Sequence, residues 1–409
     1  MWRIHRTFST WLLAVFTLTA CGERSPDTGK GGETAAESEQ QSLDRLRALP
    51  YLDFNPDAAN QEERDGVVAL DSARAWPGYS LYTVRPFCRA DLVDLRGRVV
   101  NSWKSEPCGR WAQAELLPDG TLLVVGREGK LGRVLIRFAW SGEVLWSRRL
   151  AVHHDAEQTP SGQLLAIVMA NREVDFDGAR RRIRDDQLTM LDGDGQALES
   201  RSLFDLFGAG PAPNPLAWVR VRERGATDLF HANSVEWMSR EELFGTAPVY
   251  SPDHVLVSVR HQDLVAIVDW KRSRLVWSWG KSELAGPHDA TLLDNGNVLI
   301  FDNGLGRTFS RIVEVDPRTD RIVWQYQADP PESFFTAALG GAQRLPNGNT
   351  LIANSHAGEA FEVTPEGEVV WRYLNPHKNP RGQRAAIVRM KRYEEALVEP
   401  LIAAARTPR

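Results

Sequence analysis

The chain has 409 residues, of which 42% are hydrophobic and 25% are charged, and this composition is typical of a globular protein with one large or two ordinary domains. The formal net charge of −5 gives no reason to expect a nucleic-acid partner. The sequence contains no GxxxxGK[ST] loop and no GxGxxG turn, so it offers no recognisable site for nucleotide chemistry.

Residues 1–21 are predicted to be a lipoprotein signal peptide. Basic residues precede an apolar run from Trp11 to Leu18, which is well short of the ~20 residues that a membrane-spanning helix needs. The run ends in LTAC, which resembles a bacterial lipobox. This resemblance implies cleavage before Cys21, lipidation of the Cys21 thiol, and an anchored place on the periplasmic side of a bacterial membrane or at the cell surface. Gly22 favours the outer membrane, and an uncleaved membrane anchor is the alternative.

A flexible tether is expected after the signal peptide, over residues 22–76. Its first part, residues 22–46, is polar and contains no aromatic side chain. Such a composition cannot bury enough apolar surface to fold on its own.

Two cysteines, Cys88 and Cys108, remain beyond the signal peptide. They flank a hairpin signal around Arg96-Gly97, which would bring them together. An oxidising compartment favours a disulfide between them over two buried thiols.

Two short patterns recur along the chain. One has a small residue, a charge, two apolar residues and a tryptophan, and its copies are GEVLW, SRLVW, DRIVW and GEVVW, ending at Trp146, Trp277, Trp324 and Trp371. The other is an alternating apolar run broken by a tight turn, as in LLPDGTLLVV, QTPSGQLLAIV, LLDNGNVLIF and RLPNGNTLIA. Asp-Gly and Asn-Gly tolerate the positive φ of two-residue turns, so these runs predict β-hairpins.

Together the patterns predict an all-β, six-bladed β-propeller with four-stranded blades over residues 77–393, because units of about four strands recur every ~40–60 residues. A C-terminal tail follows at 394–409. A sixth unit is shared between the chain ends, where residues 79–104 supply three strands and 385–393 the innermost one, closing the ring without a free edge. Five or seven blades stay open as alternatives, since the segment 177–230 could hide or break a blade. The five full units start near Ala112, His154, His231, His288 and Gly340.

A histidine recurs at one position of the repeat. His288 lies eight residues before Gly296 of its turn, and His154 lies eight before Gly162. His231 begins the matching strand in FHANSVEW. The innermost strand of each blade lines the central channel, so these residues are expected around one mouth of that channel. The next strand returns antiparallel and brings its last residues to the same mouth.

The return strands add polar side chains there. The strand HVLVSVRHQ delivers Arg260, and similar spacing delivers Asn171, Asn303 and His356. Histidines from separate blades lack the short fixed spacing of most metal sites, although Asp155 and Asp289 could serve as ligands or orienters. Guanidinium and imidazole N–H groups suit a phosphate or sulfate group instead. An anion site is therefore favoured, with no metal and no cofactor.

Four segments carry a resemblance to a known family: HHDAEQTPSGQLLAI, HANSV with the later SVRHQ, GPHDATLLDNGNVLIFDNG, and QRLPNGNTLIANSHAGEAFEVTPEGEVVWRYLNP. They resemble the bacterial aryl-sulfate sulfotransferases, and the resemblance extends over roughly residues 77–376. H-x-N-S-V followed by S-x-R-H-Q is its most specific part. The family implies a periplasmic six-bladed propeller that moves a sulfuryl group from a phenolic sulfate donor to a phenolic acceptor without a nucleotide donor.

The motifs carry expected roles to individual residues. His288 matches the histidine that is transiently sulfated, in a ping-pong reaction through a sulfohistidine. His231 and Arg260 match the pair that holds the sulfuryl oxygens, and His154 matches the further histidine of the site. A proton donor such as His154 or His231 would assist the leaving phenolate. Four more residues are expected to bind substrate: Asn233, Asn303, Arg307 and His356.

The sequence departs from the family in two respects. Large members carry an amino-terminal sandwich domain used in dimer formation, and the stretch before residue 77 is too short for one, so the oligomeric state is left open. A long insertion with Pro211, Pro213 and Pro215 precedes His231 and could form a lid over the site.

Two other classes of function remain as alternatives. The chain could be a noncatalytic scaffold or binding lipoprotein, which would tolerate the loss of His288. It could also be a quinoprotein-like propeller, which would carry a bound chromophore.

Overall fold

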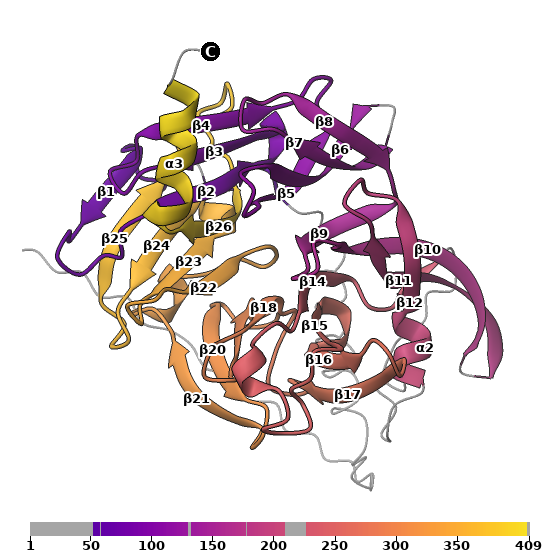
Figure 1. Cartoon of the computed structure of the whole chain (residues 1–409). Helices are drawn as coiled ribbons and strands as arrows, with labels where there is room; N and C mark the ends of the chain where they lie inside the picture. Colours follow the sequence, from indigo (N-terminus) through magenta and orange to yellow (C-terminus); the bar gives the residue numbers. More distant parts are fainter. Residues whose placement is uncertain (1–51, 58, 130–131, 177, 209–225, 407–409) are drawn as a thin grey trace, which may run out of the picture. The chain divides into compact units, whose positions relative to one another are not determined.

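The structure, a computed structural model, describes residues 52–57, 59–129, 132–176, 178–208 and 226–406. In this part of the chain, strands form six antiparallel sheets arranged as a six-bladed β-propeller (Figure 1), which confirms the predicted fold class. The predicted signal peptide, the lipidation site Cys21 and the tether up to residue 51 lie outside the described residues. So does the stretch 209–225 of the predicted insertion.

The blades are numbered along the ring, with the innermost strand of each named first. Blade 1 contains β26 (Ile387–Tyr393), β2 (Tyr79–Val84), β3 (Arg89–Val93) and β4 (Val99–Lys104). Blade 2 contains β5 (Arg110–Leu116), β6 (Leu122–Glu128), β7 (Gly132–Phe138) and β8 (Val144–Arg149). Blade 3 contains β9 (Val152–Gln158), β10 (Leu164–Phe176), β11 (Ala179–Leu191) and β12 (Ala197–Ser202).

The second half of the ring follows the same order. Blade 4 contains β14 (Ala232–Trp237), β15 (His254–Val259), β16 (Leu264–Asp269) and β17 (Arg274–Trp279). Blade 5 contains β18 (His288–Leu292), β19 (Val298–Asp302), β20 (Arg311–Asp316) and β21 (Arg321–Tyr326). Blade 6 contains β22 (Gly341–Arg344), β23 (Thr350–Asn354), β24 (Glu359–Val363) and β25 (Val369–Leu374).

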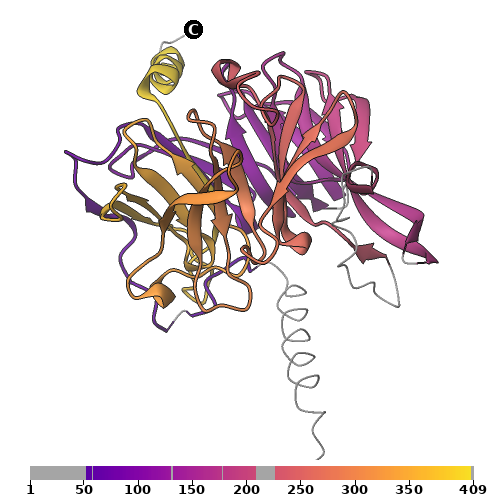
Figure 2. The same cartoon turned by 90° about the horizontal axis from the view of Figure 1, so that it is seen from below.

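Blade 3 departs from the regular pattern. Its strands β10 and β11 are 13 residues long each and project as a hairpin (Figure 2). The short strand β13 (Thr227–Asp228) pairs in parallel with β11, and helix α2 (Leu203–Gly208) follows β12. The described parts of this segment, residues 178–208 and 226–230, therefore extend one blade instead of hiding another.

Both described ends of the chain help to close the ring. The innermost strand β26 pairs with β2, with Tyr79 opposite Tyr393, as the shared sixth blade predicts. Strand β1 (Gly66–Leu70) adds a fifth strand to blade 6 by pairing with β25. The prediction of a flexible tether is wrong for this stretch, because the apolar sequence GVVAL covers the outer edge of a sheet.

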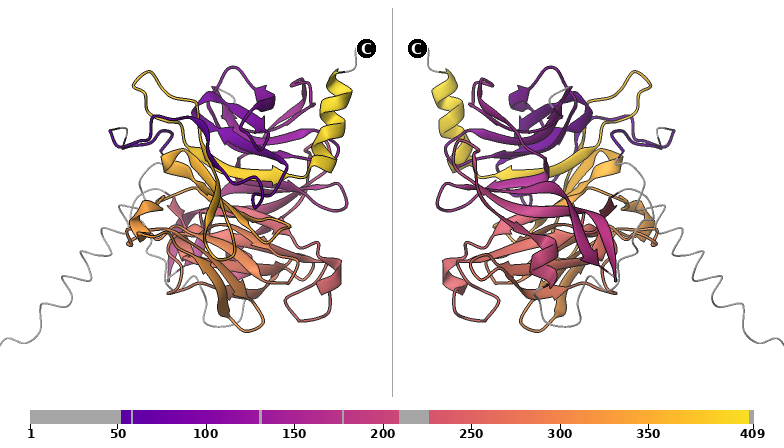
Figure 3. Two further views of the ribbon diagram at one scale, coloured as in Figure 1. Left: turned by 90° about the vertical axis from the view of Figure 1, so that its left-hand side faces the viewer. Right: turned by 90° about the vertical axis from the view of Figure 1, so that its right-hand side faces the viewer.

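The C-terminal tail contains helix α3 (Glu395–Arg406), which lies beside blade 1 (Figure 3). Its buried Val398 joins an apolar cluster with residues of blades 1 and 2. No helix among the described residues has the length and apolar character to cross a membrane.

Tryptophans of the outer strands link neighbouring blades. The indole Nε1 of Trp277 donates to Asp320 at 2.8 Å, and that of Trp324 to the carbonyl of Pro365 at 2.9 Å. Trp371 donates to the carbonyl of Leu95 at 2.9 Å. These bonds satisfy the indole N–H groups while the rings pack between sheets. A disulfide between Cys88 and Cys108, the pair expected from the sequence, adds a covalent link between blades 1 and 2.

Candidate active site

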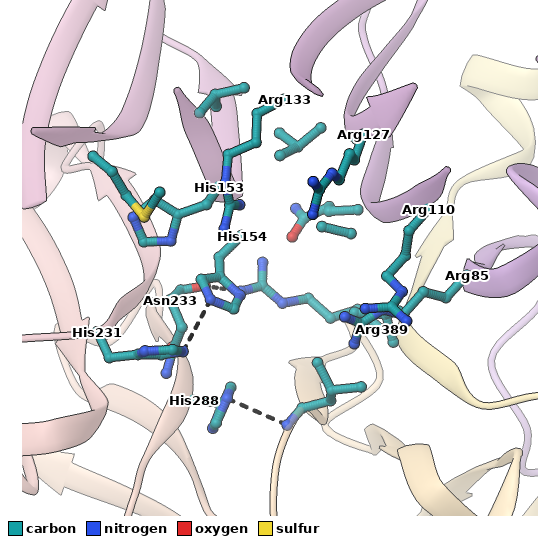
Figure 4. A pocket seen from close by; sticks show the side chains of 18 of the residues that line it. Arg85, Arg110, Arg127, Arg133, His153, His154, His231, Asn233, His288 and Arg389 are labelled. Carbon is teal, nitrogen blue, oxygen red and sulfur yellow. Dashed lines mark hydrogen bonds between the residues drawn. The ribbon is translucent and has the colours of Figure 1, made fainter. Parts of the chain in front are cut away.

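A pocket of about 160 Å³ lies at one mouth of the channel, where the innermost strands begin. Its charged lining is strongly positive (Figure 4), although the whole chain carries a net charge of −5. Among the described residues, a single carboxylate, Asp228, lines it. The lining guanidinium groups belong to Arg85, Arg110, Arg127, Arg133, Arg184 and Arg389, and the lining imidazoles to His153, His154, His231 and His288.

Local backbone distortion turns the histidines into this pocket. Register shifts interrupt the pairing of β9, β14 and β18 with their neighbours at the start of each innermost strand. His154 and His231 have φ values of 62° and 49°, and Asp289, directly after His288, has 50°. Such bulges re-aim side chains, and left-handed conformations at residues other than glycine are held only where surrounding structure supports them. Each recurring histidine thus lies at or beside a β-bulge at the start of an innermost strand.

The imidazole of His288 is held in one tautomer. Its Nδ1 donates to the side-chain oxygen of Asn303 at 2.6 Å and to the carbonyl of Gly286 at 3.1 Å. Its Nε2 accepts from the backbone N–H of Leu339 at 3.2 Å. Burial, followed by the positive charge of Arg260, holds the pKa of His288 well below its usual range. The ring is therefore neutral at pH 7, with its lone pair on Nε2.

A second chain of groups joins Asp228, His231 and His154. Nδ1 of His231 lies 2.8 Å from Oδ2 of Asp228, and the Nε2 atoms of His231 and His154 are 3.2 Å apart. Burial favours a raised pKa for Asp228, but the charges of His231 and His261 outweigh it and hold this pKa well below the usual range. Burial and repulsion by His153 and His231 also lower the pKa of His154. An ionised carboxylate therefore orients His231 against a neutral His154.

Of the two adjacent histidines, His154 faces His231, whereas Nε2 of His153 is bound to Asp186 at 2.8 Å. Arg260, in the 3-10 helix η5 (Arg260–Gln262), is 2% exposed. Its Nη1 lies 3.0 Å from Nε2 of His261. Arg260 acts on His288 electrostatically but is not one of the residues that line the described pocket.

The expected substrate-binding residues separate into two groups. Asn233 lines the pocket, and its buried Oδ1 has no hydrogen-bond partner among the described residues. Asn303 is buried behind His288, and its amide nitrogen donates to the carbonyls of Thr336 and Leu339, both at 2.8 Å. Its side chain is thus fully used in holding the imidazole.

The other two expected residues do not line the pocket. Arg307 pairs with Asp302 at 2.6 Å and packs over the ring of Phe309. His356 is half-buried, and its pKa is lowered to about 4, first by loss of solvation and then by the charge of Arg85. The spacing of the return strands indicated which mouth His356 reaches but not whether its side chain enters the pocket, and Arg307 lies outside that spacing.

Sequence reasoning missed the arginines. Arg85 follows the return strand β2, and Arg127 lies near the end of the return strand β6. They occupy the same place in their blades as Arg260 does after β15, so the spacing that indicated Arg260 was also the signal for them. Arg389 comes from the closing strand β26 and lies 3.1 Å from both Asp155 and Asp289. It fastens three blades together, since it also donates to the carbonyl of Asn233 at 2.5 Å.

Three residues at this mouth have side chains that could bind a metal ion. Asp228, His231 and His261 each offer a ligand atom, and the three atoms lie within 4.8 Å of one another. Nδ1 of His231 is, however, bound to the Asp228 carboxylate, and Nδ1 of His261 donates to the Asp228 carbonyl at 2.9 Å. Hydrogen bonding accounts for this geometry, and the surrounding guanidinium groups favour an anion over a cation.

Fold and pocket together define a propeller protein with a positively charged pocket at one channel mouth. The family model described as Arylsulfotransferase (ASST) matches residues 113–376. The chain belongs to this arylsulfotransferase family, and the resemblance recognised in its motifs is confirmed.

Individual relatives are more distant. The chain is 22% identical to "Arylsulfate sulfotransferase AssT" of Lelliottia amnigena over 78% of its own length and 66% of that protein. It is 25% identical to the "Alcohol dehydrogenase (quinone), dehydrogenase subunit" of Gluconacetobacter polyoxogenes over 35% of its length and 22% of that protein. The chain therefore spans less than two thirds of either relative.

Among solved structures, a protein of unknown function from Bacteroides caccae superposes with a TM-score of 0.50 at 15% identity, covering 77% of this chain and 98% of that one. This likeness shows the shared fold alone.

Proposed function

We propose that the protein is an aryl-sulfate sulfotransferase that moves a sulfuryl group between phenols through a sulfohistidine on His288. The observation that supports this most directly is the neutral imidazole of His288, which lines a pocket rich in guanidinium groups. Its Nε2 lone pair accepts from the backbone N–H of Leu339 and reaches the sulfur once the substrate displaces that hydrogen bond. A neutral nucleophile beside fixed positive charge is what attack on an anionic sulfate ester requires.

In the first half-reaction, Nε2 of His288 attacks the sulfur, the N–S bond forms, and the S–O bond to the aryl group breaks. The ring becomes positively charged while Nδ1 keeps its proton. The oxygens of Asn303 and Gly286 that accept this N–H therefore stabilise the developing charge. Arg260 does not line the pocket, but its positive charge acts on His288 and stabilises the negative charge of the sulfuryl oxygens electrostatically.

The leaving phenolate needs a proton, and the Asp228–His231–His154 chain supplies it. In this assignment His231 is the imidazolium, with Nδ1–H bound to ionised Asp228 and Nε2–H directed at neutral His154. His231 gives the Nε2 proton to the phenolate oxygen and becomes neutral. The free phenol then departs and leaves the sulfohistidine in the pocket.

The second half-reaction reverses these steps with another phenol. Neutral His231 takes the hydroxyl proton of the acceptor, the acceptor oxygen attacks sulfur, and the N–S bond breaks. His288 returns to its neutral state and His231 to its imidazolium state, so protons and charge balance over the cycle.

Transfer is tested with a fluorogenic aryl sulfate and a phenol acceptor. We expect release of the fluorescent phenol that depends on the acceptor, and none from His288→Ala. Intact-mass analysis after mixing with donor alone should show one added sulfuryl group on the parent protein. A parent without acceptor-dependent release, or a variant as active as the parent, would contradict the proposal.

We also propose that the protein is lipid-anchored through Cys21 on the periplasmic side of a bacterial membrane, with the outer membrane favoured. The LTAC motif supports this placement. Metabolic labelling with a fatty acid tests it, because Cys21→Ala should abolish labelling and release the protein from the membrane fraction.

The quinoprotein alternative rests on the similarity to the quinone-dependent alcohol dehydrogenase subunit. It predicts visible absorbance from a bound quinone in the purified protein, or alcohol oxidation after a quinone is added. Absence of both, together with acceptor-dependent sulfuryl transfer, decides against it.

A further inference from the structure

Arg127 and Arg133 form a like-charged pair at the pocket wall. They stand directly opposite each other in the pairing of β6 with β7, and both line the pocket. Within the described part of the chain, neither side chain makes a hydrogen bond or an ion pair. Like charges directly opposite on a hairpin destabilise it. Both side chains are exposed, so solvent screens part of this repulsion, and an anion bound between them would remove the rest.

Neighbouring groups strengthen the positive field here. The pKa of Arg133 is lowered, first by burial and then by the charges of Arg184 and Arg127. Arg184 itself is 3.4 Å from Asp228, and Arg110 is 2.5 Å from Asp53. Those two guanidinium groups have carboxylate partners within 4 Å, whereas Arg127 and Arg133 have no ion pair that close, and Asp186 and Asp228 act on Arg133 only from farther away.

The pair lies across the channel from His288. Successive blades are neighbours around the ring, so blade 2, which carries the arginine pair, faces blade 5, which carries His288. Figure 4 shows Arg127 and Arg133 on the side of the pocket away from His288. A sulfuryl group bonded to Nε2 of His288 therefore does not itself occupy the space beside the arginine pair.

Apolar side chains line the pocket together with these charged groups. They come from blades 1, 2 and 3 and from the segment before blade 6, and they are Val125, Val152, Met169, Leu339 and Val388. This lining suits an aromatic ring with one polar group at each end.

We propose that the phenols served by this enzyme carry a second anionic group, of carboxylate, sulfate or phosphate type, which binds to Arg127 and Arg133 while the sulfuryl group is at His288. Guanidinium groups bind such oxyanions through paired hydrogen bonds. The proposal rests on the sulfotransferase function proposed above. In a ping-pong cycle donor and acceptor phenols occupy the pocket in turn, so the preference extends to acceptors.

The test compares two isosteric donors, umbelliferyl sulfates with either a carboxylate or a neutral carboxamide on the ring remote from the ester. We expect the parent protein to prefer the carboxylate donor by about tenfold or more in kcat/KM. The double variant Arg127→Gln/Arg133→Gln should lose this preference, because its kcat/KM falls about tenfold further on the carboxylate donor than on the carboxamide donor. Arg96→Gln, which removes one exposed charge far from the pocket, is the matched control and should keep the preference.

Four outcomes overturn or separate the two proposals. A parent that uses both donors equally, or a double variant that loses activity on both in proportion, rules out the anion subsite and leaves the transferase intact. A lack of transfer from either donor rules out the transferase. Fluorescence titration with the two free phenols then tests the subsite by itself, and equal affinities for the carboxylate and the carboxamide would overturn it.

Discussion

The side-chain oxygen of Asn303 accepts a hydrogen bond from Nδ1 of His288 at 2.6 Å, and the orientation of this amide is fixed by two backbone carbonyls that accept from its nitrogen. The amide cannot flip without losing both of those bonds. Asn303 is therefore a positioning residue that decides which nitrogen of His288 carries the proton.

Asn303→Ala should lower kcat by roughly 10–100-fold with little change in KM. Losing the hydrogen-bond partner that orients a functional histidine has an effect of this size at other sites. The reason is that the Nδ1–H tautomer and the charge developing on the ring both lose their support. Steady-state kinetics with a fluorogenic aryl sulfate measures kcat and KM separately. Asn171→Ala, on an exposed strand position, is the control. Equal falls in kcat for both variants would contradict the role of Asn303.

The depressed pKa of His288 predicts the acid side of the pH profile. Protonation removes the Nε2 lone pair, so activity is lost as pH falls through the folded-state pKa of His288. This pKa lies well below 6.5, the ordinary value for a histidine side chain. We expect kcat/KM to stay level from pH 8 down past that value. A loss of kcat/KM on acidification with its midpoint at pH 6.5 or higher would show that His288 is not held neutral.

Asp228→Asn should make the enzyme more sensitive to the leaving phenol. Without the carboxylate, His231 is a poorer proton donor, and a donor matters most when the phenolate is strongly basic. We expect a fall of about tenfold or more for sulfates of weakly acidic phenols and a smaller fall for nitrophenyl sulfate. Asp294→Asn, an exposed change in blade 5, is the comparison. A uniform loss across leaving groups would instead indicate a structural role.

At the other end of the channel, the buried carboxyl of Glu236 has its pKa raised to about 7, chiefly by burial. The native state therefore binds this proton more tightly than the unfolded chain, and stability attributable to the group is lost as pH rises from the unfolded value of 4.5 through about 7. Glu236→Gln retains an acceptor for the N–H of Leu292. It should raise Tm at pH 8 by roughly 2–4 °C and much less at pH 5. Thermal unfolding at the two pH values measures this, and an equal gain at both would contradict the raised pKa.

Arg127→Glu separates stability from function at the arginine pair. It replaces a like-charged cross-strand pair with an attractive one, which should stabilise the hairpin by about 0.2–1 kcal/mol. The same variant should lose its preference for the carboxylate donor. Chemical denaturation measures the first effect, and a destabilised variant would show that the pair is not repulsive in the folded protein.

The fold was largely predictable because its signals are local and repeated. Gly296 adopts a φ of 87° in the turn between β18 and β19, as the Asn-Gly sequence indicates. Each such turn sets the register of its innermost strand, and that register placed His154 and His288 at one mouth. His231 was placed with them because it begins the matching strand of its blade. The pairing of β1 with β25 could not be read, since it joins residues about 300 positions apart with no local signal.

The charged residues were harder to interpret. An arginine at the end of a strand is usually interpreted as a solvated surface charge. The sequence therefore did not indicate that Arg127 and Arg133 lie opposite each other on neighbouring strands and line the pocket. Asn303 was placed at the correct mouth, but its role depends on the carbonyls of Thr336 and Leu339, which the chain brings in from beyond blade 5. Contacts between distant segments, and not residue types, decide these roles.

The closing strand β26 has a consequence for the order of biosynthesis. Arg389, which fastens Asp155, Asp289 and the carbonyl of Asn233, lies on the last strand of the ring to leave the ribosome. A nascent chain that has completed its other blades still lacks the residue that organises the pocket. The pocket is thus completed only when the propeller itself is complete, so a chain that still lacks β26 has not yet formed it.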